Sequence, residues 1–186
     1  INPFESNAKI YLNKENREKY ILQDNLLFQN NDGSEYFKKV KIKNKIFFAH
    51  SPYGAISVFD EVFDKEQHRY LYIDTRVQCS TEGYKRQEIS EINFINIALN
   101  AMDRGHLQVL NIGLGCGFTL NEIAKNQKVQ SVDVVEINPV MPEAAKCFNA
   151  FTDRILDNPK VNLIFNDGYK YLLSTPKKYD LIIMDI

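Results

Sequence analysis

The second half of the chain alternates short apolar runs with amphipathic stretches. Apolar residues recur at three- and four-residue steps from 89 to 102, which predicts a helix with one apolar face, ending at Arg104-Gly105. The pattern then predicts strands at 108–112, 131–135, 161–165 and 181–184, alternating with helices at 119–126, 142–151 and 169–173. Such alternation is typical of an α/β fold with a parallel sheet and helices on both faces.

The first half has a different pattern. Short β-type runs at 37–42, 45–49, 55–59 and 69–73 predict a small antiparallel sheet, whereas residues 1–35 are polar and Asn-rich and suggest only a helical stretch near 13–22. We therefore expect three parts: a polar N-terminal segment (1–35), a small β domain (36–86) and a Rossmann-like nucleoside-binding domain (87–186). The last apolar run ends the chain at Asp185-Ile186, so we expect this domain to be incomplete and the chain to be a fragment of a longer protein.

Composition narrows the possible partners. With 23 Lys and Arg against 24 Asp and Glu the formal charge is −1, and no basic run is long enough to bind a phosphate backbone or an anionic membrane surface. No apolar run approaches the roughly 20 residues of a membrane span. We therefore expect neither nucleic acid nor a membrane as partner.

The cysteines are three in number and lack a C-x-x-C spacing, which favours thiols in a reducing, cytoplasmic setting. We expect Cys116 to be a small, core-facing thiol rather than a nucleophile. No metal is expected, because the histidines share no ligand spacing with the cysteines: these are His50, His68 and His106.

A glycine-rich loop carries the clearest functional signal. Gly113, Gly115 and Gly117 follow a predicted strand and precede a predicted helix, where glycines let backbone amides approach a ligand at a helix N-terminus. A dinucleotide-binding loop would have a sixth-position glycine where Phe118 stands, so the loop favours a ligand without a diphosphate. The alternative is a tight turn that binds nothing.

Acidic residues end the next three predicted strands. Glu136 is suited to accept both hydroxyl protons of a ribose. Asp167 could accept the adenine amino proton while Gly168 admits the flat ring, although an Asp here could equally be a helix cap. Asp185 lies at the carboxyl edge of the sheet and is our candidate catalytic base.

Several short motifs together resemble the spermidine synthase family of aminopropyltransferases. The matching stretches are Ser51-Pro-Tyr-Gly-Ala-Ile-Ser-Val58, Arg69-Tyr-Leu-Tyr-Ile-Asp74, Val77-Gln78, Gln87-Glu88, the glycine loop, Val135-Glu136-Ile137, Asp157-Asn-Pro-Lys-Val161, Asp167-Gly168 and Tyr179-Asp-Leu-Ile-Ile-Met-Asp185. Each is weak alone, but their order and spacing are fairly specific.

The resemblance implies a small β domain followed by a Rossmann-like domain of the S-adenosylmethionine-dependent methyltransferase type. It implies transfer of an aminopropyl group from decarboxylated S-adenosylmethionine to an amine acceptor such as putrescine, and a homodimer. By the same resemblance Asp185 is the catalytic aspartate and binds substrate with Gln78, while Glu136, Asp167 and Gln87 contact the ribose, the adenine and the sulfur end of the donor.

Two departures from the family pattern keep other functions open. Cys116 stands where the family's Gly-Gly-Gly-Asp-Gly loop has Asp, which removes a partner for the donor's ammonium group, and Arg86 would repel a polyamine but suit a carboxylate. One alternative is therefore a methyltransferase that uses S-adenosylmethionine itself. Another is a non-catalytic nucleoside-binding module.

Overall fold

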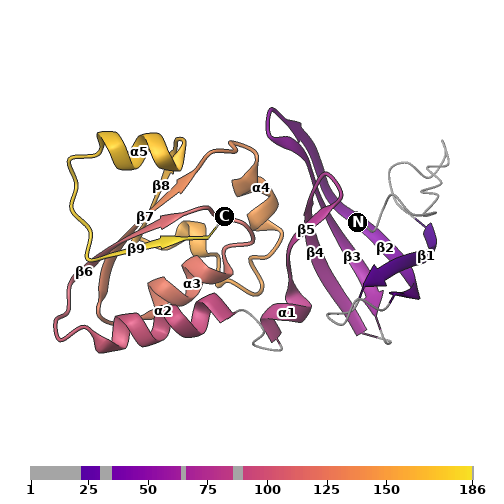
Figure 1. Ribbon diagram of the computed structural model, residues 1–186, viewed down its shortest axis with the longest axis horizontal. Helices are drawn as coiled ribbons and strands as arrows, with labels where there is room; N and C mark the ends of the chain where they lie inside the picture. The colour runs from indigo at the N-terminus through magenta and orange to yellow at the C-terminus, as the bar shows by residue number, and fades with distance from the viewer. Residues whose placement is uncertain (1–21, 30–34, 64–65, 86–89, 186) are drawn as a thin grey trace.

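The chain forms two sheets that lie side by side (Figure 1). The computed structural model describes residues 22–29, 35–63, 66–85 and 90–185. One sheet is antiparallel with the strand order β1-β2-β3-β4-β5, and the other is parallel with the order β8-β7-β6-β9.

The antiparallel sheet comes first in the chain, and each of its strands pairs with the next. It begins earlier than the sequence pattern predicted, because a strand lies within the segment that we expected to be polar and separate. The predicted strands 37–42 and 45–49 are one continuous strand, β2. The elements are β1 (Leu22–Gln29), β2 (Glu35–Ser51), β3 (Gly54–Phe63), β4 (Glu66–Ile73) and β5 (Arg76–Ser80), followed by the short helix α1 (Thr81–Lys85).

The parallel sheet confirms the predicted alternation of strands and helices. The strands predicted over 161–165 and 181–184 match the structure at both ends. The helix predicted over 142–151 is shorter than expected, because it ends at Lys146. The elements are α2 (Ser90–Ala101), β6 (Leu107–Ile112), α3 (Phe118–Lys125), β7 (Val129–Glu136), α4 (Met141–Lys146), the 3-10 helix η1 (Ile155–Asp157), β8 (Val161–Phe165), α5 (Gly168–Ser174) and β9 (Leu181–Met184).

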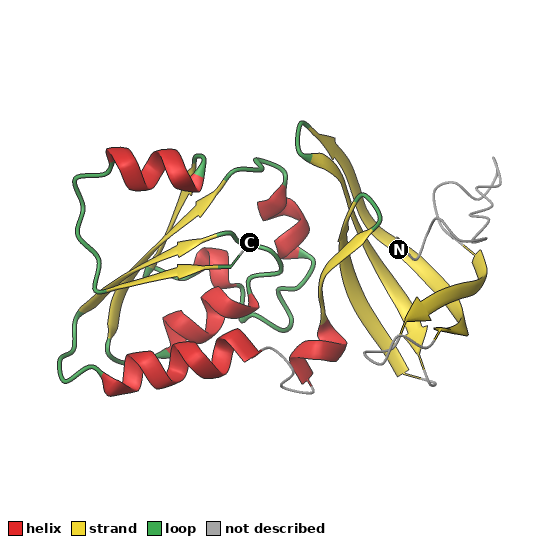
Figure 2. Cartoon of the chain, in the orientation of Figure 1, coloured by secondary structure: helices red, strands yellow, loops and turns green. Residues whose placement is uncertain are grey.

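Helices cover both faces of the parallel sheet, α2 and α3 on one side and α5 on the other (Figure 2). Because successive strand residues point to opposite faces, neighbours on β6 enter different clusters: Val109 packs in the cluster of α2 and α3, and Leu110 in the cluster beside α5. Both faces of the central strands β6 and β7 are buried, which explains their nearly continuous apolar sequences, whereas the outer strands β8 and β9 are only partly covered. Along the described part of the chain, no helix combines the length and apolar character needed to cross a membrane.

The carboxyl ends of the parallel strands point toward the antiparallel sheet (Figure 1). Side chains join the two parts: Asn138 Nδ2 donates to Ser51 Oγ at 2.9 Å, and the Arg69 guanidinium donates to the backbone carbonyl of Cys147. The Tyr84 ring stacks on Phe118 with 4.3 Å between the ring centroids. The edge at which an open α/β sheet binds its ligands therefore faces the small sheet.

Candidate active site

A cavity of about 800 Å³ lies at this edge, between β5 and the ends of β6, β7 and β9. Every predicted site residue that the structure describes lines it, and Gln87, like Arg86, lies outside the described residues. The predicted residues that meet here are Gln78, Gly113, Gly115, Gly117, Glu136, Asp167, Gly168 and Asp185.

The glycine loop forms the turn between β6 and α3. All three glycines have left-handed backbones, with φ of 97° at Gly113, 51° at Gly115 and 80° at Gly117, a region that residues with a Cβ rarely adopt. A Cβ on Gly117 would lie 3.0 Å from a methyl group of Ile155, whereas a Cβ on Gly115 would meet no atom within 4 Å apart from those of its neighbours in the chain. Gly117 is therefore needed for packing, and Gly115 borders open space in the cavity.

Glu136 ties the glycine loop to the end of β7. One carboxylate oxygen accepts the backbone N–H of Leu114 at 3.0 Å, and the other accepts that of Asn138 at 2.7 Å. The side chain is buried, and this burial raises its pKa although the backbone donors of Asn138, Leu114 and Ile137 lower it. Because a carboxylate has about four acceptor positions, Glu136 keeps the capacity to accept protons from a ligand as well.

Asp167 caps helix α5, the alternative that the sequence left open. Its Oδ1 accepts the backbone N–H of Lys170 at 3.0 Å, which uses one of its two oxygens. Gly168 follows at the first position of the helix, and a Cβ there would lie only 2.4 Å from a methyl group of Ile112. Glycine at this position lets the helix approach β6 closely, a packing reason in addition to the one predicted.

Asp185 lies beside the glycine loop because β9 pairs with β6. The strands are in register at Ile112 and Met184, and the Asp185 N–H continues the pairing by donating to the Ile112 carbonyl at 2.9 Å. Its side chain is half-buried in the cavity lining. Gln78 is exposed on β5 and borders the same cavity from the small sheet.

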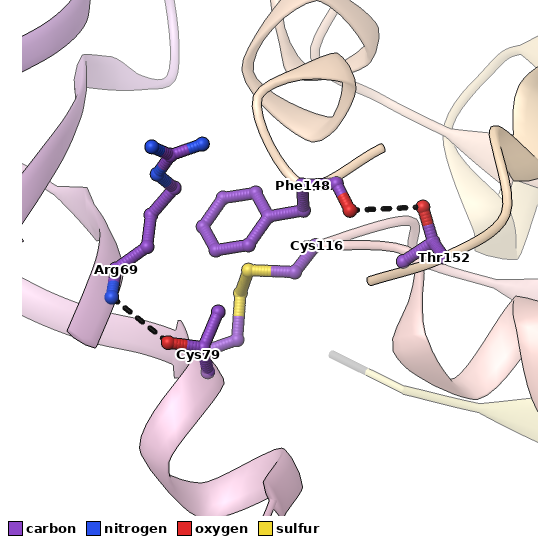
Figure 3. The surroundings of a disulfide bond; sticks show 6 residues. Arg69, Cys79, Cys116, Phe148 and Thr152 are labelled. Carbon is purple, nitrogen blue, oxygen red and sulfur yellow. Dashed lines mark hydrogen bonds between the residues drawn. A yellow bond between two sulfur atoms is a disulfide. The ribbon is translucent and has the colours of Figure 1, made fainter. Parts of the chain in front are cut away.

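The structure corrects the expectation that Cys116 is a free thiol. Cys116 is joined by a disulfide to Cys79 of β5, with 6.2 Å between their Cα atoms (Figure 3). Both residues line the cavity, and the Phe148 ring lies next to the bond. Cys147 is the remaining free cysteine among the described residues. The sequence pattern favoured three free thiols and hence a reducing compartment. Because two of the cysteines form a disulfide, that argument no longer holds.

The apolar residues of the cavity lining were not among the predicted site residues. Four of these residues come within five positions after a predicted site residue, and that proximity is the signal that could have found them: Ile137, Met141, Tyr169 and Leu172. Tyr169 is 72% exposed, so its ring presents a large surface to the cavity. No metal-binding cluster of His, Cys, Asp or Glu occurs within the described ranges.

A glycine loop after the first strand, acidic residues at the ends of the following strands and a parallel sheet with helices on both faces define a Rossmann-like fold of the methyltransferase type. Residues 93–186, just over half of the chain, match the family described as the spermine/spermidine synthase domain. The chain therefore belongs to the spermidine synthase family, as its motifs indicated.

Two polyamine aminopropyltransferases are among the proteins similar to this chain. The polyamine aminopropyltransferase of Methanocaldococcus jannaschii is 47% identical over 77 residues, which are 41% of this chain and 26% of that protein. That of Alkaliphilus oremlandii is 28% identical over 146 residues, or 78% and 49% of the two chains. This chain thus spans at most about half the length of these relatives.

Solved structures confirm the fold. Spermidine synthase from Thermotoga maritima superposes with a TM-score of 0.66 at 20% identity, covering 86% of this chain and 52% of that one. A spermidine synthase in complex with the transition-state analogue AdoDATO gives 0.65 at 19% identity, covering 98% and 57%. At these identities the likeness concerns the fold alone.

Proposed function

We propose that this chain carries the donor site of an aminopropyltransferase, which moves an aminopropyl group from decarboxylated S-adenosylmethionine to an amine. One observation carries the proposal: the glycine loop, Glu136, Asp167 and Asp185 line a single cavity large enough for a nucleoside, in a member of the spermidine synthase family. The similarity of this chain to the two polyamine aminopropyltransferases named above supports the same proposal.

Glu136 is our proposed ligand of the donor ribose. Its two oxygens are held by the backbone N–H groups of Leu114 and Asn138, so the carboxylate is fixed before the ligand arrives. Each oxygen retains a lone pair, and two acceptors match the two hydroxyl groups of a ribose. Its burial strengthens these hydrogen bonds because the local dielectric constant is low.

The adenine would lie between β7 and α5. Asp167 has one oxygen in the helix cap and a second for the exocyclic amine of the base. Ile137 and Tyr169 offer apolar surface for a flat ring, with 40% and 72% of their surfaces exposed in the cavity lining.

Asp185 is our proposed base for the acceptor amine. The amine nitrogen attacks the carbon beside the sulfonium, the C–S bond breaks, and its electron pair leaves the sulfur as the neutral thioether of methylthioadenosine. The new secondary ammonium then loses its extra proton, which a nearby carboxylate can accept. We place Asp185 in this role, with Gln78 on the opposite side of the cavity to bind the acceptor. Putrescine is our proposed acceptor, although Arg86 in the sequence argues for an acceptor that carries a carboxylate.

A methyltransferase remains the alternative because of one observation. The loop position next to Gly117 holds a neutral disulfide instead of a carboxylate, so this part of the cavity offers no charge partner for a donor ammonium. A donor that retains its methionine carboxylate would lose less by this change.

Calorimetric binding of decarboxylated and intact S-adenosylmethionine tests the proposal. We expect the decarboxylated donor to bind at least tenfold more tightly. A clear preference for the intact donor would overturn aminopropyl transfer in favour of methyl transfer. Thermal stabilisation by methylthioadenosine without transfer to any amine would instead identify a nucleoside-binding module.

The role of Asp185 is tested by the variant Asp185→Asn. We expect transfer to slow by at least about 100-fold while donor affinity changes little, because general-base catalysis contributes roughly 10²–10⁴ in rate. Glu143→Gln is the matched control, since Glu143 lies on the surface of α4 paired with Lys146. Equal activity of Asp185→Asn and the control would exclude Asp185 as the base.

We also propose, from the family, a homodimer in the cytoplasm, and a division into a segment over 1–35, a β domain over 36–86 and a nucleoside-binding domain over 87–186. The pairing of β1 with β2 argues for moving the first boundary toward the N-terminus.

A further inference from the structure

The Cys79–Cys116 disulfide joins two opposite sides of the proposed donor site. Cys79 follows Gln78 on β5, which belongs to the small sheet, and Cys116 lies in the glycine loop of the parallel sheet. The two residues are 37 positions apart in the chain. The bond therefore fixes the distance between the two structural units at the cavity itself.

We propose that this pair is a reversible oxidation site and that the disulfide form binds the nucleoside more tightly than the dithiol form. The proposal rests on the donor site proposed above and adds its regulation. In the structure the cross-linked form has a cavity of about 800 Å³, so the bond is compatible with an open site.

The physical reason is the spacing of the two sulfur atoms. Bonded sulfurs lie about 2 Å apart, whereas unbonded heavy atoms settle at roughly 3.5–4 Å. Reduction therefore pushes β5 and the glycine loop apart or forces one thiol to rotate. Cys116 is only 2% exposed and packs in the core near Phe118 and Phe148, so rotation has little room there.

The glycine loop is sensitive to such a shift. Cys116 lies between Gly115 and Gly117, both with left-handed backbones, and the Leu114 N–H of the same loop is bound to Glu136. A displacement of Cys116 thus moves the amides and the carboxylate that the ligand would contact. The disulfide keeps these groups in the positions from which they bind the ligand, which reduces the conformational entropy lost on binding.

The oxidant that this chemistry needs is a small disulfide, RSSR. The thiolate of Cys79, the more exposed of the two residues, attacks one sulfur of RSSR and releases one thiolate RS⁻. The Cys116 thiolate then attacks the Cys79 sulfur in the mixed disulfide and releases the second RS⁻. The protein thiols lose two protons and two electrons, and RSSR becomes two RSH.

Thermodynamic linkage gives a direct test. If the oxidised form binds the nucleoside more tightly by some factor, the nucleoside must favour oxidation by the same factor. The probe is methylthioadenosine, and the protein is equilibrated with mixtures of reduced and oxidised glutathione. Trapping of free thiols and mass measurement then give the oxidised fraction, with and without the probe.

We expect saturating methylthioadenosine to raise the equilibrium constant for oxidation about tenfold, within the usual range of coupling between sites. Cys147→Ser should behave like the wild type because Cys147 lies outside the bond. Cys79→Ser should abolish the redox dependence and bind the probe as the reduced wild type does. A constant unchanged by the probe, or no disulfide in oxidised glutathione, would overturn the inference.

Failure of the proposed function would look different. In that case methylthioadenosine would bind neither the oxidised nor the reduced protein in calorimetry. Binding of equal strength to both forms would leave the donor site standing and exclude only its regulation by oxidation.

Discussion

The glycines of the loop serve two separate purposes, and each purpose belongs to particular residues. Gly117 makes room for Ile155, so its missing side chain is a requirement of packing between α3 and η1. Gly115 has no neighbour at the position of a Cβ apart from the adjacent residues of the chain, so its missing side chain leaves space in the cavity. A sequence motif does not distinguish the roles of Gly115 and Gly117, whereas their surroundings in the structure do.

Alanine substitutions should show the difference. Both variants suffer about 1–2 kcal/mol of strain from the left-handed backbone. Gly117→Ala adds overlap with Ile155 and should lose roughly 1–3 kcal/mol more in the free energy of unfolding. Gly115→Ala should instead lose nucleoside affinity by tenfold or more. Urea unfolding measures the stability of both variants, and calorimetry measures their nucleoside affinity. Equal losses of stability and of affinity in Gly115→Ala and Gly117→Ala would contradict the separate roles of the two glycines.

Glu61 is a buried carboxyl group whose ionisation should affect stability. It is 2% exposed on β3, and burial raises its pKa from 4.5 to about 7, although the hydrogen bond from Tyr72 lowers it and the nearby charge of Glu82 raises it. A raised pKa means that the folded protein binds this proton more tightly than the unfolded chain. The stabilisation is complete below pH 4.5 and is lost as the pH rises through 7.

We therefore expect Glu61→Gln to flatten the pH dependence of unfolding. Between pH 4.5 and 8 the wild type should lose up to about 3 kcal/mol through this group, at 1.36 kcal/mol per pKa unit. The amide oxygen of Gln can still accept the Tyr72 proton. Urea unfolding at pH 5 and pH 8 measures the effect, with the exposed Glu143→Gln as control. An identical pH slope in wild type and Glu61→Gln would refute this role.

At the scale of elements, α5 is held both by its partly buried side chains Tyr171 and Leu172 and by a network of polar contacts. The helix has no fully buried residue, yet it supplies Gly168 to the cavity and is capped by Asp167. Its anchor is Asp133 on β7, which accepts from Tyr179 at 2.6 Å, and Tyr179 in turn contacts the Tyr171 hydroxyl at 2.6 Å. Although burial raises the pKa of Asp133, bonds from Lys177, Tyr179 and Asn162 outweigh it and lower that pKa.

Tyr179→Phe should loosen α5 without unfolding the sheet. The variant removes a hydrogen bond to a charged group, worth about 1.5–3 kcal/mol. Amide hydrogen exchange should accelerate about tenfold or more in α5 and remain unchanged in β6 and β7. Tyr53→Phe, in an exposed turn, is the matched control. Uniform acceleration across all elements would show instead that the network stabilises the whole molecule.

At the scale of the whole molecule, the parallel half could be predicted and the junction could not. β8 and β9 matched at both ends because each is a short apolar run bounded by polar and turn-forming residues, which mark where the strand begins and ends. The acidic strand ends met in one cavity because parallel strands end at one edge. β1 was missed because its sequence, Leu-Gln-Asp-Asn-Leu-Leu-Phe-Gln, lacks the alternation of a half-buried strand.

The disulfide lies at that junction, and no local pattern could reveal it. Cys79 and Cys116 meet only because the small sheet packs on the carboxyl edge of the large one. Pairing of residues 37 positions apart depends on the tertiary arrangement, which periodicity does not encode.

This cross-link also changes the connectivity of the molecule. Together with the backbone it closes a ring that contains α1, α2 and β6, so in the oxidised protein the two sheets are joined by two covalent routes. A protease that cuts once inside the ring opens it but releases no fragment, and the two pieces separate only after reduction. The peptide connection between the sheets is thereby dispensable for holding them together as long as the sulfur bridge is intact.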